Sequence, residues 1–200
     1  MVPTAAPSQT EIREKILDQA EQLFRHYGYA KTTMADIAEG CKMSPANLYR
    51  FFASKSALVE GICCKVTRMA EQRLLTIVNS DASASRRLEL FIAQMHQNTL
   101  ENLLDHRKVH EMVLVAMEEN WSAIKEHLGR VCTLIERLIR EGMASGEFEQ
   151  QDPVRTARTV QASLVCLCHP AVVAQKLEDE NRAKPDELAA FVIRSLKARI

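Results

Sequence analysis

Residues 33–55 constrain the fold of this chain more than any other stretch, because they carry the start and stop signals of three successive helices. Thr33 is a good N-cap residue and Asp36 follows three positions later, a spacing that predicts the start of a short helix. Gly40 can adopt the left-handed conformation that closes a helix, so we expect this helix to end there. Ser44, followed directly by a proline, predicts the start of a second helix.

Two short helices joined by a tight turn form a helix-turn-helix, in which the N-terminal residues of the second helix enter the major groove of DNA. Residues 41–43 make the turn, and Leu48 and Phe52, four residues apart, are expected to face inward. Ser54 predicts a third helix whose first residue, Lys55, can pair with a DNA phosphate. The outer side of the second helix is expected to present Ser44, Pro45, Ala46, Asn47, Tyr49 and Arg50.

The charge pattern predicts a positive face on a neutral molecule. The chain has 26 basic and 26 acidic residues, which argues against a protein coated for nonspecific nucleic-acid binding. Between Lys42 and Lys55, however, the charged residues are Lys42, Arg50 and Lys55, and none is acidic. We therefore expect modest and salt-sensitive nonspecific affinity for DNA.

The string N-L-Y-R-F-F-x-S-K-x-x-L, preceded by T-x-x-x-I-A and ended by Leu58, resembles the TetR (tetracycline-repressor-like) family of bacterial regulators. An earlier pattern, A-x-x-L-F-x-x-x-G-Y from Ala20 to Tyr29, is similar to the first helix of that family. The resemblance implies an all-α fold. It places an N-terminal three-helix helix-turn-helix DNA-binding domain over residues 1–57 and a helical ligand-binding and dimerisation domain over residues 58–200.

The resemblance also implies a sequence-specific DNA-binding transcriptional regulator, with repression and release from a palindromic operator by a small-molecule effector as the family's usual mode. Thr33 and Lys55 match backbone-phosphate contacts of the family, and Tyr49 matches a tyrosine that lies against the sugar-phosphate chain. In one departure, Met34 and Ala35 stand where some relatives carry an arginine, so a base contact from that point is not expected. The positions that vary in the family and set the operator are Pro45, Ala46, Asn47, Arg50 and Phe51.

Helical periodicity continues to the C-terminus. The helix after Ser54 is expected to reach about Val78 and to join both halves as one rigid lever, before a linker at residues 80–85. Gly142 and Gly146 are expected to break the chain. A helix opening at Pro153 is apolar nearly all round, as expected where both a core and a second subunit cover it, and a last helix follows Pro185.

In the TetR family two C-terminal helices form a four-helix bundle with those of a second subunit, and the resemblance implies a homodimer of this kind. The alternative is that both helices complete a monomeric core. The residues expected at the dimer interface are Leu164, Val165, Leu167, Phe191, Val192 and Leu196.

The middle helices of the resembling family enclose a cavity for a small effector, and the corresponding stretch here is rich in adaptable methionines. A methionine stripe at helical spacing is also typical of an ordinary core, and that alternative stays open. The residues expected to line a ligand pocket are Phe91, Met95, Thr99, His110, Met117, Trp121 and Gln161.

The six cysteines are expected to be reduced structural thiols, and no metal or other cofactor is predicted. The vicinal pair Cys63 and Cys64 cannot easily bridge without strain. Cys166, Cys168 and His169 lack the spacing common in zinc sites. Their position near the expected dimer interface leaves redox or metal sensing as a minority hypothesis.

No nucleophile triad, Gly-rich phosphate loop, HExxH motif or paired carboxylates in an apolar context can be found, so an enzyme is not expected. The rival classes are a helical small-molecule enzyme or carrier and a protein-binding adaptor without DNA affinity, which a gel-shift assay separates. No apolar run approaches the roughly 18 residues of a membrane span, and the N-terminus has no signal-peptide pattern. We therefore expect a cytoplasmic protein with a double-stranded DNA operator and a small effector as partners, and no membrane contact.

Overall fold

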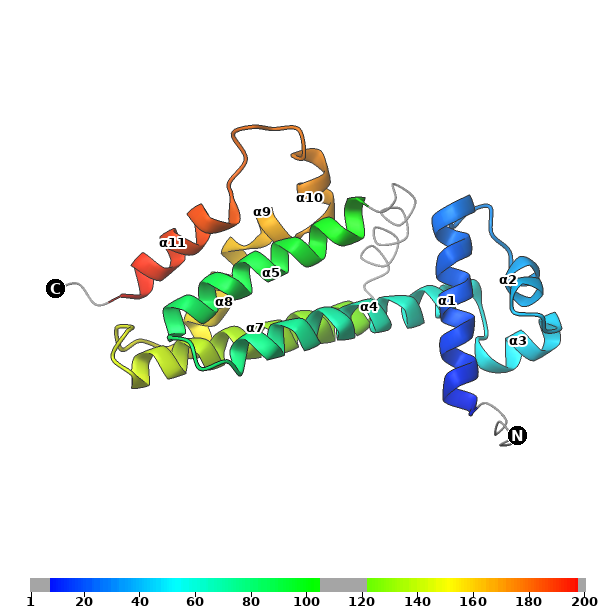
Figure 1. Cartoon of the computed structure of the whole chain (residues 1–200), viewed down its shortest axis with the longest axis horizontal. Helices are drawn as coiled ribbons and strands as arrows, with labels where there is room; N and C mark the ends of the chain where they lie inside the picture. The colour runs from blue at the N-terminus through cyan, green and yellow to red at the C-terminus, as the bar shows by residue number, and fades with distance from the viewer. Residues whose placement is uncertain (1–7, 105–121, 198–200) are drawn as a thin grey trace, which may run out of the picture.

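A computed structural model of the chain describes residues 8–104 and 122–197, and the regular secondary structure within these ranges is helical (Figure 1). The predicted all-α fold is therefore confirmed. The N-terminal helices are α1 (Gln9–Tyr27), α2 (Met34–Gly40), α3 (Pro45–Phe51) and α4 (Lys55–Val78). The C-terminal helices are α5 (Ala84–Leu104), α7 (Ser122–Ala144), α8 (Pro153–Ser163), α9 (Val165–Cys168), α10 (Pro170–Gln175) and α11 (Pro185–Leu196).

The first four helices begin at side-chain caps that satisfy otherwise unpaired N–H groups of the first turn. Ser8, Thr33, Ser44 and Ser54 each accept a hydrogen bond from the backbone N–H three residues on. The last three of these caps are the ones that the sequence predicted. Short helices of seven residues, such as α2 and α3, therefore have well-defined first residues even though their intrinsic stability is small.

The turn between α2 and α3 differs from the prediction at one position. Gly40 is the last residue of α2, and the left-handed residue is Lys42, with a φ of 56°. Gly40 has a different role, because a Cβ atom there would lie 2.7 Å from Nε2 of Gln19 on α1. The glycine therefore allows α1 and α2 to approach closely, and Lys42 makes the left-handed turn.

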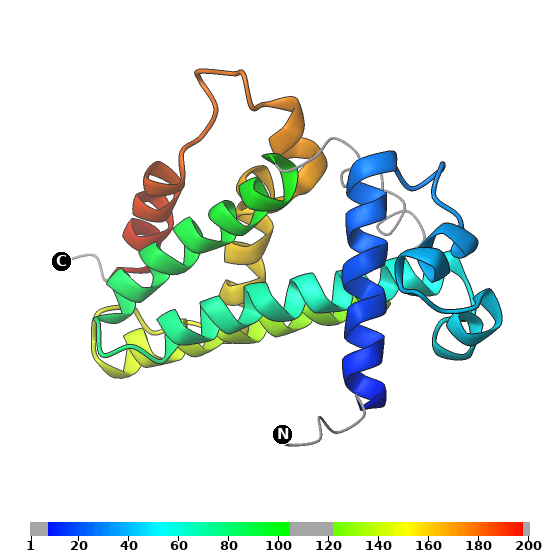
Figure 2. The ribbon, with the colours of Figure 1, turned by 45° about the vertical axis from the view of Figure 1, so that its right-hand side comes forward.

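Helix α4 runs from the N-terminal unit into the C-terminal unit, where it lies alongside α7, as Figures 1 and 2 show. Leu58 and Ile62 near its start are buried in the N-terminal core, whereas Leu74 and Val78 near its end are buried in the C-terminal core. The expected boundary between residues 57 and 58 falls inside this continuous helix. The prediction of one helix that reaches Val78 and joins both halves is therefore confirmed.

In the C-terminal unit α4 lies beside α5 and α7, and α8, α9, α10 and α11 complete the bundle (Figure 2). The prediction that Gly142 breaks the chain is wrong, because Gly142 lies within α7. The Phe148 ring occupies the space that a side chain at this position would need. The break comes at Gly146, whose φ is 78°. The single helix expected after Pro153 is interrupted near Leu164, where α8 ends and the short α9 begins. Among the described residues, no helix is both long enough and apolar enough to cross a membrane.

Candidate DNA-binding site

Helix α3 is held from one side and exposed on the other. Leu48 is fully buried and Phe52 is 2% exposed, as predicted, and both belong to the N-terminal core. Ala46, Tyr49 and Arg50 lie at i, i+3 and i+4, so they share one face of the helix, and each is exposed. Tyr49 is a large side chain that is 51% exposed in the protomer. This face is the one expected to enter a major groove.

The start of α2 is fixed by a reciprocal pair of hydrogen bonds between Thr33 and Asp36. The Asp36 carboxylate accepts from the Thr33 hydroxyl at 2.7 Å and from its backbone N–H at 2.8 Å, and the Asp36 N–H donates to the hydroxyl oxygen at 3.2 Å. These side-chain and backbone hydrogen bonds from Thr33 hold the pKa of Asp36 below its ordinary value. Thr33 is exposed, but its hydroxyl and its backbone N–H both donate to Asp36, so a phosphate would have to take one of these hydrogen bonds from the carboxylate.

The Lys55 ammonium is used inside the N-terminal unit. Lys55 Nζ donates to the carbonyl oxygens of Tyr29 at 2.7 Å and Thr32 at 3.1 Å, and it lies 4.2 Å from the centre of the Tyr29 ring. Lysine has three N–H donors, so one of them is left for another acceptor. The structure therefore gives Lys55 a positioning role that the sequence did not suggest, because it ties the start of α4 to the loop before Thr33.

Arg13 is a further positioning residue that sequence analysis missed. Its Nη1 donates to the Phe51 carbonyl oxygen at 2.9 Å, and its guanidinium lies 4.1 Å from the centre of the Phe52 ring. The hydrogen bond satisfies a carbonyl in the last turn of α3, where helix carbonyls have no partner within the helix. Arg13 and Phe51 are 38 positions apart, so no local pattern could have indicated this contact.

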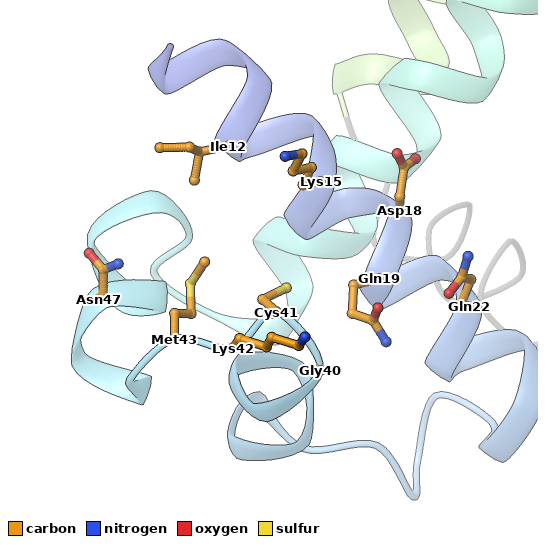
Figure 3. Close-up of a pocket in the computed structure, with 10 residues that line it drawn as sticks. All are labelled: Ile12, Lys15, Asp18, Gln19, Gln22, Gly40, Cys41, Lys42, Met43 and Asn47. Atoms are coloured by element: carbon orange, nitrogen blue, oxygen red, sulfur yellow. The ribbon is translucent and has the colours of Figure 1, made fainter. Parts of the chain in front are cut away.

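The remaining predicted DNA-binding residues differ in their exposure to solvent. Ser44 and Pro45 are exposed at the start of α3, but Asn47 is partly buried and lines a cleft against α1 (Figure 3). Phe51 is partly buried and packs against the N-terminal core, so its side chain is less available to DNA than that of Arg50. These assignments to DNA contacts stay predictions.

The structure corrects the expected dimer interface. Four of its six residues lie inside the protomer's own core: Leu164 and Leu167 are 1% exposed, Leu196 is 2% and Val192 is 3%. Such side chains have no surface left to bury against a second subunit. Val165 at 48% and Phe191 at 60% exposure stay available. Helical periodicity identified the apolar positions of both groups, but it could not show which of them the protomer's own helices cover.

The expected pocket residues are only partly brought together. Met95 and Thr99 lie one turn apart on α5, and the Thr99 hydroxyl donates to the Cys168 carbonyl oxygen at 3.2 Å. Phe91 is instead fully buried in the C-terminal core, and the Gln161 amide donates to the Leu128 carbonyl oxygen on α7 at 2.7 Å. Packing in the protomer's own core therefore explains the position of Phe91, and a hydrogen bond within the protomer explains that of Gln161. His110, Met117 and Trp121 lie outside the described residues.

Cys63 and Cys168 are poorly suited to redox or metal sensing. Burial, and to a smaller extent the neighbouring Cys166 thiol, raises the pKa of Cys168 to about 12, so its thiolate is scarce. Burial likewise raises the pKa of Cys63 to about 12. In residues 8–104 and 122–197 no three His, Cys, Asp or Glu side chains gather where they could hold a metal ion.

The helix-turn-helix exposes its second helix, and the long helix α4 joins it to a separate helical bundle. This arrangement is typical of a DNA-binding regulator. Comparison with known families agrees with this class. Residues 16–62 match the bacterial regulatory proteins of the tetR family, and residues 84–189 match the tetracyclin repressor-like C-terminal domain. The chain therefore belongs to the TetR family and is a DNA-binding transcriptional regulator rather than an enzyme.

Individual relatives are similar over most of the chain. An uncharacterized HTH-type transcriptional regulator, YhgD of Bacillus subtilis, is 26% identical over 153 residues, which are 72% of this chain and 76% of the relative. A transcriptional regulator from Cytophaga hutchinsonii shares the fold with a TM-score of 0.72 at 21% identity, covering 92% of this chain and 98% of that one. A complex of SmeT with triclosan has a TM-score of 0.65 at 23% identity, covering 94% and 92%.

Proposed function

We propose that this regulator is a cytoplasmic repressor that binds a palindromic operator as a homodimer and leaves it when a small molecule binds. The observation that carries the proposal is the exposed row of Ala46, Tyr49 and Arg50 on a helix that Ser44 caps at its start and Arg13 of α1 holds at its last turn. Arginine at this position donates in a forked geometry suited to the O6 and N7 acceptors of guanine, and a neighbouring Asn47 matches adenine. Phosphate contacts from Thr33, Tyr49 and the remaining donor of Lys55 would set the register.

A dimer follows from the small size of the recognition helix. Helix α3 has seven residues, so one protomer reads few base pairs, and specific affinity requires a second half-site. Phe191 on α11 and Val165 on α9 are exposed apolar side chains on the helices that pack around the C-terminal core. The proposed two-fold interface lies at these side chains, and reading two half-sites requires it to hold the two recognition helices one DNA turn apart.

Release by an effector requires a connection between the C-terminal bundle and α3, and α4 supplies it. Glu71 on α4 accepts from His127 at 2.7 Å and from Arg130 at 2.8 Å, both on α7. Arg73 on α4 donates to Glu101 on α5 at 2.6 Å. A ligand that moves α5 or α7 therefore also moves α4, whose first turn is tied by Lys55 to the DNA-binding unit.

The proposed ligand is a small, largely apolar molecule beside α5. Met95 offers an adaptable apolar side chain there, and His96 and Thr99 hydrogen-bond to the carbonyls of Leu167 and Cys168 on α9. The triclosan complex of SmeT supports this ligand class by likeness of fold. A hundredfold loss of operator affinity needs about 2.7 kcal/mol of coupling, within the range of known allosteric systems.

The proposal is tested by selecting bound duplexes from a random pool with the full-length chain. Palindromic sequences with half-sites one helical turn apart are expected, and sedimentation should show two chains on each duplex. Compounds that displace the protein are then sought, and Trp121 fluorescence reports their binding because Trp121 is the single tryptophan of the chain. Selection that recovers no common sequence would contradict the operator, and displacement by no compound would contradict the effector.

A further inference from the structure

Lys42 occupies a backbone conformation that its side chain disfavours. It is the one non-glycine residue of the described ranges with a positive φ, at 56°. A side chain with a Cβ atom is strained in this left-handed region, and glycine is the residue best suited to it. Residues kept in such conformations cluster at functional sites, which prompts the question of what the Lys42 side chain contacts.

The side chain of Lys42 borders a cleft of about 500 Å³ between α1 and the turn that precedes α3 (Figure 3). Lys15 stands on the α1 wall, Lys42 on the turn, and Asn47 of the recognition helix lines the same cleft. Both lysines are exposed. Within the described part of the chain, no hydrogen bond or ion pair engages the Lys42 ammonium.

The acidic side chain in the cleft does not offset these charges. Asp18 lines the cleft, but its carboxylate forms an ion pair with Lys65 of α4. Glu11 lies one turn before Lys15, and its carboxylate accepts the Ser8 backbone N–H at 2.6 Å. Hydrogen bonds with Ser8 and, to a smaller extent, the Lys15 charge lower the pKa of Glu11, so Glu11 partly offsets Lys15 but not Lys42. The cleft therefore has an excess of positive charge beside a residue expected to contact bases.

The length of α2 is close to the width of the major groove of DNA. Seven residues at about 1.5 Å per residue make α2 about 10 Å long, close to the roughly 12 Å width of the major groove. Thr33 caps one end of α2, and Lys42 follows the other end. If α2 spans the groove when α3 lies in it, groups at opposite ends of α2 approach opposite phosphate backbones.

We propose that Lys42 and Lys15 bind phosphates of the second DNA strand, across the groove from the strand that Thr33 contacts. This inference rests on the proposed function and adds a contact to each half-site. It accounts for a lysine at a position where glycine would be less strained, because glycine has no charge to offer a phosphate. The rival explanation is that Lys42 only compensates the negative end of the α2 dipole, which requires no DNA.

The test measures affinity of the full-length chain for the selected duplex and for a random-sequence duplex between about 50 and 200 mM salt. Lys42→Gly is expected to weaken binding to both duplexes roughly tenfold, and to make the negative slope of log affinity against log salt shallower by about 2 per dimer, one contact in each protomer. Lys42→Arg should retain affinity and slope. Lys15→Ala should act in the same direction as Lys42→Gly.

Two controls distinguish loss of the proposed Lys42–phosphate contact from a change in net charge and from unfolding. Lys125→Ala removes the same charge from an exposed position on α7 and should change neither affinity nor slope. The thermal midpoint of Lys42→Gly should not fall, since glycine adopts the left-handed conformation without strain, so a loss of binding cannot reflect unfolding. Parental affinity and slope in Lys42→Gly would overturn this inference while leaving the proposed function intact. A parental protein that binds no duplex would overturn both.

Discussion

Lys55 Nζ donates a 2.7 Å hydrogen bond to the carbonyl oxygen of Tyr29 and lies above the ring of the same residue. The resemblance assigns Lys55 a contact with a DNA phosphate. The structure shows that Lys55 also clamps the start of α4 to the loop that leads to Thr33. The distance between the start of α4 and the start of α2 depends on this contact. Both helix starts are expected at the DNA backbone, so the clamp fixes the spacing of two phosphate contacts.

Lys55→Met should lower the free energy of unfolding by about 1–3 kcal/mol, because the Tyr29 and Thr32 carbonyls lose a charged donor. Affinity for all DNA sequences should fall with it. Urea denaturation measures the first effect and gel-shift titration the second. Lys31→Met, an exposed lysine in the same loop, should change stability by less than about 0.5 kcal/mol. Unchanged stability of Lys55→Met would mean that the clamp contributes nothing.

Arg50→Ala should cost roughly 1–3 kcal/mol of operator binding and relax the base preference at one position in each half-site. The effect differs from that of Lys55→Met, because a base contact is lost and the backbone contacts stay. Repeating the duplex selection with the variant shows which position has relaxed. An unaltered consensus together with parental affinity would remove Arg50 from the base-contacting residues.

Two glycines of α7, one packed and one open, allow the same Gly→Ala substitution to be compared for its effect on stability. Gly142→Ala would place a Cβ atom 2.1 Å from Cδ2 of Phe148, so the ring must move, and we expect a loss of about 1–3 kcal/mol in the free energy of unfolding. Gly129→Ala meets nothing within 4 Å, and alanine should stabilise this helix by up to about 1 kcal/mol. Thermal denaturation of both variants compares the two. Equal midpoints would contradict the packing of Phe148 on Gly142.

Phe191→Glu and Val192→Glu should behave differently although the residues are adjacent. Phe191 is 60% exposed, so a charge there should dissociate the proposed dimer and leave a folded protomer. Val192 is 3% exposed, so a charge there should unfold the C-terminal bundle itself. Sedimentation and circular dichroism distinguish the two results. A stable dimer of Phe191→Glu would place the interface elsewhere.

The Thr33 and Asp36 pair predicts a pH dependence of stability. Hydrogen bonds from Thr33 lower the pKa of Asp36 in the folded protein, so its contribution is present above the unfolded pKa of about 3.9 and is lost as pH falls through the folded value. Asp36→Asn should therefore be less stable than the parent at pH 7. The difference should shrink as the pH falls below about 4. Urea denaturation across this range measures it, and a difference independent of pH would exclude the carboxylate as the cause.

Local signals in the sequence determined the helices of the DNA-binding unit. The caps at Thr33, Ser44 and Ser54 act on N–H groups only three residues away, so their effect does not depend on the rest of the fold. The inward positions of Leu48 and Phe52 follow from helical periodicity on a short amphipathic helix. The string that resembles the TetR family lies in the same region, and the family was confirmed.

The tertiary structure alone decided which partner each long side chain takes and which apolar face is covered. Arg13 and Phe51, or Lys55 and Tyr29, are brought together by the packing of α1 against α2 and α4, and no spacing along the chain encodes such contacts. Leu164 and Val165 are adjacent and equally apolar, yet one is 1% and the other 48% exposed. Hydrophobicity drives both toward burial, but the break between α8 and α9 sets the direction in which each points.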